Sequence, residues 1–169
     1  MNFKALRIYE ENGTFIRKIV ERDINELPEG EVLIKVKYSS LNYKDALSCI
    51  GNRGVTREYP HTPGIDAAGI VEDSKVSEFI KGEEVFITGY DLGMNTDGGF
   101  GEYVRVPANW VVKKPANLSL KEAMIYGTAG FTSALSIFEL IKEVAPEDGD
   151  ILVIGAGGGV GSHSVKFLT

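Results

Sequence analysis

The glycine-rich stretch GAGGGVG, from Gly155 to Gly161, limits the possible folds of this chain more than any other feature. It follows the apolar run ILVIG, predicted to be a buried strand over 151–155, and precedes SHSVKFLT, which is predicted to begin a helix. A strand, a glycine loop and a helix N-terminus together make an anion site. Backbone N–H groups and the helix dipole point at a pyrophosphate, which can approach because side chains are absent. The stretch therefore predicts the first strand, loop and helix of a dinucleotide-binding domain.

The spacing of this loop departs from the standard G-x-G-x-x-G motif. Val160 stands where the last glycine would be, and the spacing fits G-x-x-G-x-x-G through Gly158 instead. A glycine-rich turn that serves only close packing is the alternative. The residue that reads the ribose lies about 20 residues beyond such a loop, past Thr169, so the residues present do not choose between NAD and NADP. The loop residues predicted to bind the cofactor are Gly157, Gly158, Gly159, Val160 and Gly161.

Up to about Pro115 the sequence has the pattern of β structure. KALRIYEENGTFIRKIVE predicts two strands joined at Asn12-Gly13, a strong hairpin signal. EVLIKVKYSS, over 31–40, alternates in its middle and predicts another strand. Further strands are predicted at GIDAAGIVE, GEEVFITGY, GEYVRVP and WVVKKP. Many short strands at close spacing favour a barrel or a sandwich.

The pattern then changes to helix. NLSLKEAMIYG has a predicted N-cap at Ser119 and a capping box completed by Glu122, and this helix is predicted to end at Gly127. FTSALSIFELIKEV predicts a second helix. We therefore expect a β domain over 1–118, followed over 119–169 by linking helices and the first strand, loop and helix of an incomplete dinucleotide-binding domain.

Composition excludes several classes of function. The chain has 24 acidic and 18 basic residues, a net charge of −6 and no basic cluster, so nucleic-acid binding is not expected. No apolar stretch approaches the about 18 residues of a membrane span. The N-terminus carries charges at Lys4 and Arg7 instead of the apolar segment of a signal peptide. The one cysteine, Cys49, suits a reducing compartment, and we expect a cytoplasmic protein that does not bind membranes.

The chain contains four motifs in this order: SSLNYKDAL, YPHTPGIDAAGIV, DGGFGEYVRVP and YGTAGFTSAL. Because of these motifs, the chain resembles the medium-chain dehydrogenase/reductase superfamily. It is most similar to the zinc-free quinone-oxidoreductase branch, and within that to the acryloyl-CoA reductase-like group. The resemblance implies a mainly β GroES-like barrel domain, followed by the first elements of an α/β Rossmann domain. Family chains are about twice as long, near the size at which single cores split into domains, so we expect a truncated chain that is inactive alone.

The resemblance implies an oxidoreductase that transfers a hydride from NADPH to an enone, a quinone or an acryloyl-CoA-like thioester. It also implies a small-molecule substrate and a homodimer. In the family, the positions of Asn42, Tyr43 and Thr128 border the nicotinamide. Tyr43 is the catalytic candidate, because its O–H can polarise a substrate carbonyl or deliver a proton. Arg53 and Arg57 could attract an acidic substrate, although a solvated loop is the favoured interpretation.

Structural alternatives exist for these positions. Asn42 to Asp45 can form a polar turn at a strand end, in which Asn and Asp cap backbone groups. Lys44 can pair with Asp45, and Thr128 can cap the second helix. For the whole protein, one alternative is a non-catalytic interaction module built on the β domain.

The other alternative is a zinc-dependent alcohol dehydrogenase, which the ligand count opposes. A catalytic zinc needs three protein ligands, commonly Cys and His. The chain offers only Cys49, His61 and His163. Ile65 stands where zinc-dependent relatives have a ligand, so we expect no metal site.

Overall fold

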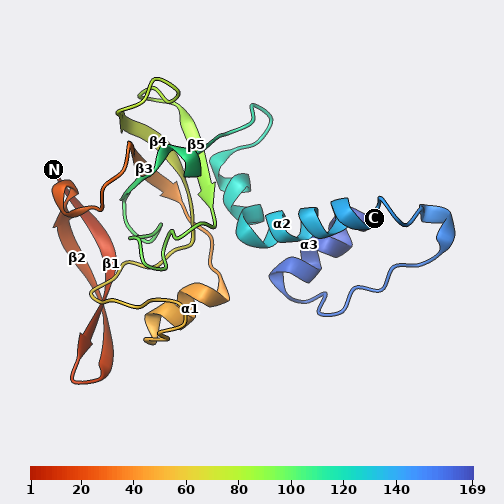
Figure 1. Cartoon of the computed structure of the whole chain (residues 1–169), viewed down its shortest axis with the longest axis horizontal. Coiled ribbons are helices and arrows are strands. Elements are labelled where there is room, and N and C mark those ends of the chain that lie inside the picture. Colours follow the sequence, from red (N-terminus) through yellow and green to blue (C-terminus); the bar gives the residue numbers. More distant parts are fainter. The chain divides into compact units, whose positions relative to one another are not determined.

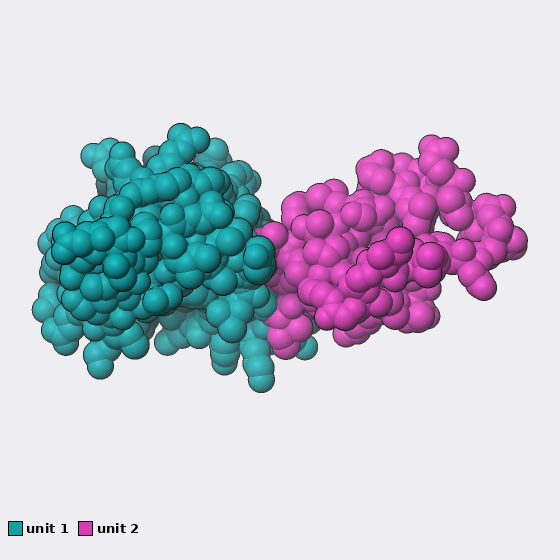
Figure 2. Space-filling view, turned by 90° about the horizontal axis from the view of Figure 1, so that it is seen from below, with its two compact units in different colours: residues 1–124 teal, residues 125–169 magenta.

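The computed structural model describes residues 1–169 and divides them into two compact units, residues 1–124 and 125–169 (Figures 1 and 2). The strands all lie in the first unit: β1 (Asn2–Glu11), β2 (Thr14–Asp23), β3 (Val32–Tyr38), β4 (Asp66–Ser74), β5 (Glu84–Thr88), β6 (Tyr103–Val106) and β7 (Val112–Lys113). The helices are α1 (Tyr43–Cys49), α2 (Leu120–Leu140) and α3 (Gly159–Leu168), with 3₁₀ turns at Ile24–Glu26, Ala108–Trp110 and Pro146–Asp148. None of the helices has both the length and the apolar character needed to cross a membrane.

Strands β1 and β2 form the predicted hairpin. Their antiparallel register pairs Glu11 with Thr14, which leaves Asn12 and Gly13 in the turn with φ of 52° and 76°. Tight hairpin turns of this kind need positive φ at both central residues, and Asn-Gly accepts that most readily. The local signal at Asn12-Gly13 is therefore confirmed.

The other strands of the first unit form a five-stranded antiparallel sheet in the order β6-β3-β4-β5-β7. On β3, Val32 and Ile34 lie in the main core, as their alternation predicts. Leu33, on the opposite face, is also buried, in a second cluster with Phe3 of β1. Backbone hydrogen bonds such as Leu6 N to Phe100 O, at 2.9 Å, join the hairpin to the loop before β6. The mainly β first part of the chain is thus confirmed.

The local signals in α2 are also confirmed. The Ser119 N–H donates to Glu122 Oε2 over 2.9 Å, and the Glu122 N–H donates to Ser119 Oγ over 3.2 Å, which completes the capping box. The helix is interrupted at Gly127, where φ is 48° and ψ is −154°. It resumes at once and ends at Leu140, earlier than the predicted end at Val144.

The predicted strand over 151–155 is wrong. Residues 151–153 belong to no regular element, and 154–157 form a turn. The side chains of Leu152 and Ile154 are 84% and 89% exposed. A strand is stabilised by hydrogen bonds to a neighbouring strand, and the second unit contains no other strand to pair with this apolar run.

Candidate functional site

Helix α1 begins at the polar segment for which the sequence pattern alone predicts a turn. Asn42 precedes the helix in an extended conformation, with φ of −122° and ψ of 153°. The Asp45 carboxylate accepts the Asn42 N–H at 2.8 Å through Oδ2 and the Ile65 N–H at 3.0 Å through Oδ1. Asp45, which is 2% exposed, therefore holds the first turn of α1 against the segment that leads into β4. The expected capping by Asp is present, within a helix too short to give a periodic pattern.

The side chain of Asn42 is fixed by a second carboxylate. Its amide Nδ2 donates to Asp66 Oδ2 over 2.9 Å. Asp66 is fully buried at the start of β4, and its carbonyl oxygen accepts the Ser39 hydroxyl at 2.7 Å. Asn42 is thus held through both its backbone and its side chain.

The buried position of Asp45 changes its acidity. Burial raises the pKa of Asp45 above its ordinary value, and the charge of nearby Asp66 acts in the same direction. The N–H groups of Asn42 and Ile65, which stabilise the carboxylate, oppose the shift in pKa only in part. The Asp45 carboxyl therefore holds its proton to a higher pH than a solvated aspartate does.

Tyr43 is the first residue of α1, next to the fixed Asn42. Its side chain is 79% exposed in the structure. The position of this side chain is therefore set by the backbone at the start of α1, and its O–H is accessible to a small molecule. The catalytic role of Tyr43 stays a prediction.

The predicted cofactor loop lies in the second unit, where α3 begins at Gly159, before the predicted helix start. Gly155 has a φ of 76°, and its carbonyl oxygen accepts the Gly158 N–H at 2.9 Å. A Cβ on Gly161 would lie 2.2 Å from that same oxygen, so only glycine fits there, whereas a Cβ on Gly157 would meet nothing within 4 Å. The first N–H groups of a helix have no partner within it. The geometry leaves room for a ligand at Gly157, next to the N-terminus of α3.

Thr128 follows the interruption of α2 at Gly127, also in the second unit. Its carbonyl oxygen accepts the Thr132 hydroxyl at 2.7 Å. Its proposed place beside a cofactor stays a prediction, as do those of Asn42 and the loop residues.

The soft metal-ligand candidates occupy separate places. Cys49 lies at the end of α1, and burial raises the pKa of its thiol. His61 is buried, in an isolated backbone bridge to Ile8, and its Nε2 lies 2.9 Å from Gly93 O. His163 lies in α3, where its ring stacks on Phe167. No group of three His, Cys, Asp or Glu side chains is arranged to hold a metal ion.

Arg53 is engaged within the first unit. Its guanidinium pairs with Glu10 and lies 5.2 Å from the ring centre of Tyr59 and 5.9 Å from that of Phe15. It also donates to the carbonyl oxygen of Arg57. These contacts give Arg53 a structural role on the surface beside the hairpin.

Asp66 is the residue of this site that sequence reasoning missed. The GID stretch predicts a strand and the absence of a metal ligand at Ile65, but not that the aspartate that opens β4 is the partner of Asn42. A charged residue directly before the apolar run AAGIV was the available signal, since buried carboxylates need hydrogen-bond donors.

Comparisons with known proteins give consistent results. Residues 28–116 match the family described as the alcohol dehydrogenase GroES-like domain. The yhdH oxidoreductase of Salmonella enterica, solved in complex with NADP, has a TM-score of 0.95 at 43% identity, covering 99% of this chain and 52% of that one. The Bacillus subtilis protein yhfP, solved with NAD bound, has a TM-score of 0.95 at 47% identity, covering 99% of this chain and 51% of that one.

A curated relative is similar over the same extent. The acrylyl-CoA reductase AcuI of Ruegeria pomeroyi is 42% identical over 161 residues, which are 94% of this chain and 48% of the relative. The chain therefore spans about half the length of the relatives it matches.

Proposed function

The chain belongs to the medium-chain dehydrogenase/reductase superfamily. From that premise we propose that it forms part of an NADPH-dependent oxidoreductase. The proposed reaction transfers a hydride to an enone, a quinone or an enoyl thioester of the acryloyl-CoA kind. A relative named for acrylyl-CoA reduction, and others solved with NADP or NAD, support the proposal. The relatives have about as many residues again outside the matched part, and we propose that catalysis needs them.

The glycine loop carries the proposal, because its residues fit a pyrophosphate. Gly157 leaves the space around it open, and the close approach of Gly161 to Gly155 O keeps the turn tight before α3. The N–H groups at the start of α3 and the positive end of the helix dipole favour an anion at this place. The NADP bound to the Salmonella relative supports the proposed preference for NADPH over NADH. The NAD bound to the Bacillus relative argues for the other cofactor.

Bound NADPH would supply the hydride that reduces the substrate. Tyr43 would donate its O–H to the substrate carbonyl oxygen, where negative charge develops as the hydride arrives. Asp45 and Asp66 would hold Asn42, and with it the start of α1, so that Tyr43 needs little reorganisation. A proton must then reach the neighbouring carbon.

The proposed reaction uses no zinc. Ile65 is an aliphatic residue, 4% exposed, at the position where zinc-dependent relatives carry a ligand. Its backbone N–H is occupied by Asp45. The backbone at Ile65 therefore anchors the first turn of α1 through Asp45.

The test is cofactor binding by a full-length protein that contains this chain, measured by NADPH fluorescence, with the variants Gly157→Ala and Gly54→Ala. A methyl group at Gly157 meets no protein atom but fills the space where a pyrophosphate would lie, so binding should weaken at least tenfold while folding is unchanged. Gly54, a solvated glycine of the first unit, is the matched control. No NADPH binding by the wild type, or equal binding by both variants, would favour a non-catalytic interaction module.

A further inference from the structure

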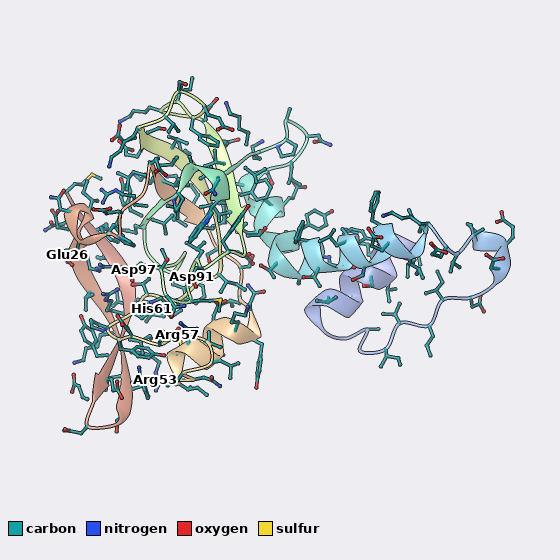
Figure 3. The ribbon with its side chains drawn as sticks, viewed as in Figure 1. Glu26, Arg53, Arg57, His61, Asp91 and Asp97 are labelled. Atoms are coloured by element: carbon teal, nitrogen blue, oxygen red, sulfur yellow. The ribbon has the colours of Figure 1, made fainter.

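Asp97, labelled in Figure 3 with His61 and Asp91, lies in the first unit, and its carboxylate contacts two arginines. Arg22 of β2 places a guanidinium nitrogen 2.6 Å from Asp97 Oδ2, and Arg7 of β1 contacts Oδ1. The Thr62 N–H also donates to Oδ1, over 3.2 Å. The side chains of Arg7, Arg22 and Asp97 are only 13%, 5% and 11% exposed. Buried charges of this kind are held by one another, and we call them, with His61, the Asp97 cluster.

His61 adds a titratable ring to this cluster. Its Nε2 lies 2.9 Å from Gly93 O, and since a carbonyl only accepts, the neutral ring carries its hydrogen on Nε2. Nδ1 is then an acceptor, 4.0 Å from Asp97 Oδ1. The groups around His61 are Asp91 and Asp97 from the loop before β6, Arg7 from β1 and the ring of Tyr59.

The charge state of His61 follows from this environment. Burial lowers the pKa of His61 below its ordinary value, and the charge of Arg7 acts in the same direction. The Gly93 carbonyl and the charges of Asp97 and Asp91 oppose the shift in pKa but do not reverse it. The ring is therefore neutral at neutral pH and gains its proton only in more acidic solution.

The segment that follows Asp97 lies directly on the candidate site. The N–H groups of Gly98, Gly99 and Phe100 donate to the carbonyls of Thr62, Gly64 and Pro63, at 2.7, 2.8 and 3.0 Å. A Cβ on Gly99 would lie 2.3 Å from Asp66 O and 2.8 Å from Ser39 Oγ. Residues 98–100 therefore support the backbone of Asp66, the partner of Asn42.

We propose that Asp97 is a positioning residue for the candidate site, and that protonation of His61 releases it. With His61 neutral, Arg7 and Arg22 hold Asp97, and segment 98–100 stays on Asp66. A second proton on His61 turns Nδ1 into a donor within reach of Asp97 Oδ1, where it competes with Arg7 and Thr62 N–H. Arg22 keeps Glu26 as a second partner, with Nε 3.3 Å from Glu26 Oε2, whereas Asp97 is the carboxylate that Arg7, Arg22 and the protonated ring would share, so its hold on the segment loosens. The inference rests on the geometry of the first unit and does not require the proposed reaction.

The first experiment needs no cofactor and no variant of Asp97. Amide exchange of Gly98, Gly99 and Phe100 is followed by NMR in the whole chain as the pH falls, with His61 titrated in the same samples. After correction for intrinsic exchange, opening of these amides should increase about tenfold or more as His61 gains its proton. The Val71 amide, bonded to Glu83 O in the sheet, should not follow.

Two variants sharpen this experiment. His61→Gln keeps a side-chain N–H for Gly93 O but cannot titrate, and it should remove the acid-dependent opening. Asp97→Asn should expose the same amides about tenfold or more at neutral pH and shift the NMR signals of the Asn42 side-chain amide. Asp73→Asn makes the same chemical change at an exposed position of β4 and should do neither.

Specific outcomes would overturn the inference. One is that the amides of segment 98–100 stay as protected in Asp97→Asn as in the wild type. Another is that the Val71 amide loses as much protection as they do, which would show that Asp97 only stabilises the whole unit. If Asp97→Asn does not fold, the wild-type titration and His61→Gln decide: opening that ignores His61 contradicts the proposal. Because none of these readouts uses NADPH, they stay separate from the failure of the proposed function.

Discussion

The side-chain amide of Asn42 donates to the buried carboxylate of Asp66 over 2.9 Å, linking the residue before α1 to the first residue of β4. Asp66 is fully buried, so each donor that reaches its carboxylate compensates for lost hydration. Asn42→Ala removes one such donor, and it should lower the free energy of unfolding by about 1–3 kcal/mol.

Urea denaturation of the whole chain measures this effect. Asn117→Ala, at an exposed asparagine of the first unit, is the control and should change the free energy by less than about 0.5 kcal/mol. Equal stability of the two variants would mean that the Asn42–Asp66 contact is not maintained in solution.

The second prediction concerns the pH dependence that Asp45 introduces. Burial raises the pKa of Asp45 above its ordinary value of 3.8, so the folded state favours the protonated acid. This contribution to stability is fully present below the unfolded pKa and is lost as the pH rises through the folded pKa. Asp45→Asn lacks the titration.

The stability of the wild type relative to Asp45→Asn should therefore fall as the pH rises from about 4, the ordinary value for an aspartate. Denaturation of both proteins at a series of increasing pH values checks the sign. A rise in relative stability would mean that the N–H groups of Asn42 and Ile65 outweigh burial and lower the pKa.

The third prediction concerns the tight turn before α3. A Cβ on Gly161 would lie 2.2 Å from the backbone oxygen of Gly155, which cannot rotate away as a side chain would. Gly161→Ala should destabilise the second unit by about 1–3 kcal/mol, seen as faster amide exchange in α3. Gly157→Ala, which meets no atom within 4 Å, should leave that exchange unchanged.

The fourth prediction concerns metal content. Purified protein should carry no stoichiometric zinc, and chelators should leave its folding unchanged, since Cys49, His61 and His163 are the only Cys and His residues of the chain. Emission spectrometry that finds about one zinc per chain would contradict this.

The fold features predicted correctly are those that short stretches of sequence determine. The Asn12-Gly13 turn, the Ser119–Glu122 capping box and the interruption at Gly127 each depend on residues a few positions apart. The strand over 151–155 failed because a strand needs a partner, which no local pattern supplies. Helix α1 was missed because seven residues are too few for a 3.6-residue period to appear.

In the candidate site, too, local sequence patterns did not supply the contacts between distant residues. The sequence motif picked out Asn42 and Tyr43, but it gave no partner for either. The partner of Asn42 lies 24 positions away, and the two arginine partners of Asp97 lie 75 and 90 positions away. Such contacts join segments that only the β topology brings together, so they had to be read from the structure.

The last prediction concerns the proposed catalytic residue. In a catalytically competent protein containing this chain, Tyr43→Phe should lower kcat for an enone or acryloyl-CoA-type substrate while NADPH affinity stays nearly unchanged. A phenolic donor aimed at the carbonyl oxygen acts mainly as charge develops there, so its loss is felt in the transition state. Loss of one such donor typically costs about 10²–10³ in rate. The 79% exposure of Tyr43 favours the lower end, because water weakens the interaction.

Tyr43→Ala separates this role from simple packing against the nicotinamide. If Tyr43 only packs, Phe should preserve kcat, and Ala alone should weaken NADPH binding. If the O–H acts on the substrate, Phe and Ala should lose kcat to a similar extent. Lys44→Ala, at the next exposed position of α1, is the matched control and should change neither constant. Steady-state kinetics with cofactor Kd measured by fluorescence distinguish these outcomes, and an unchanged kcat in Tyr43→Phe would remove the phenol from the mechanism.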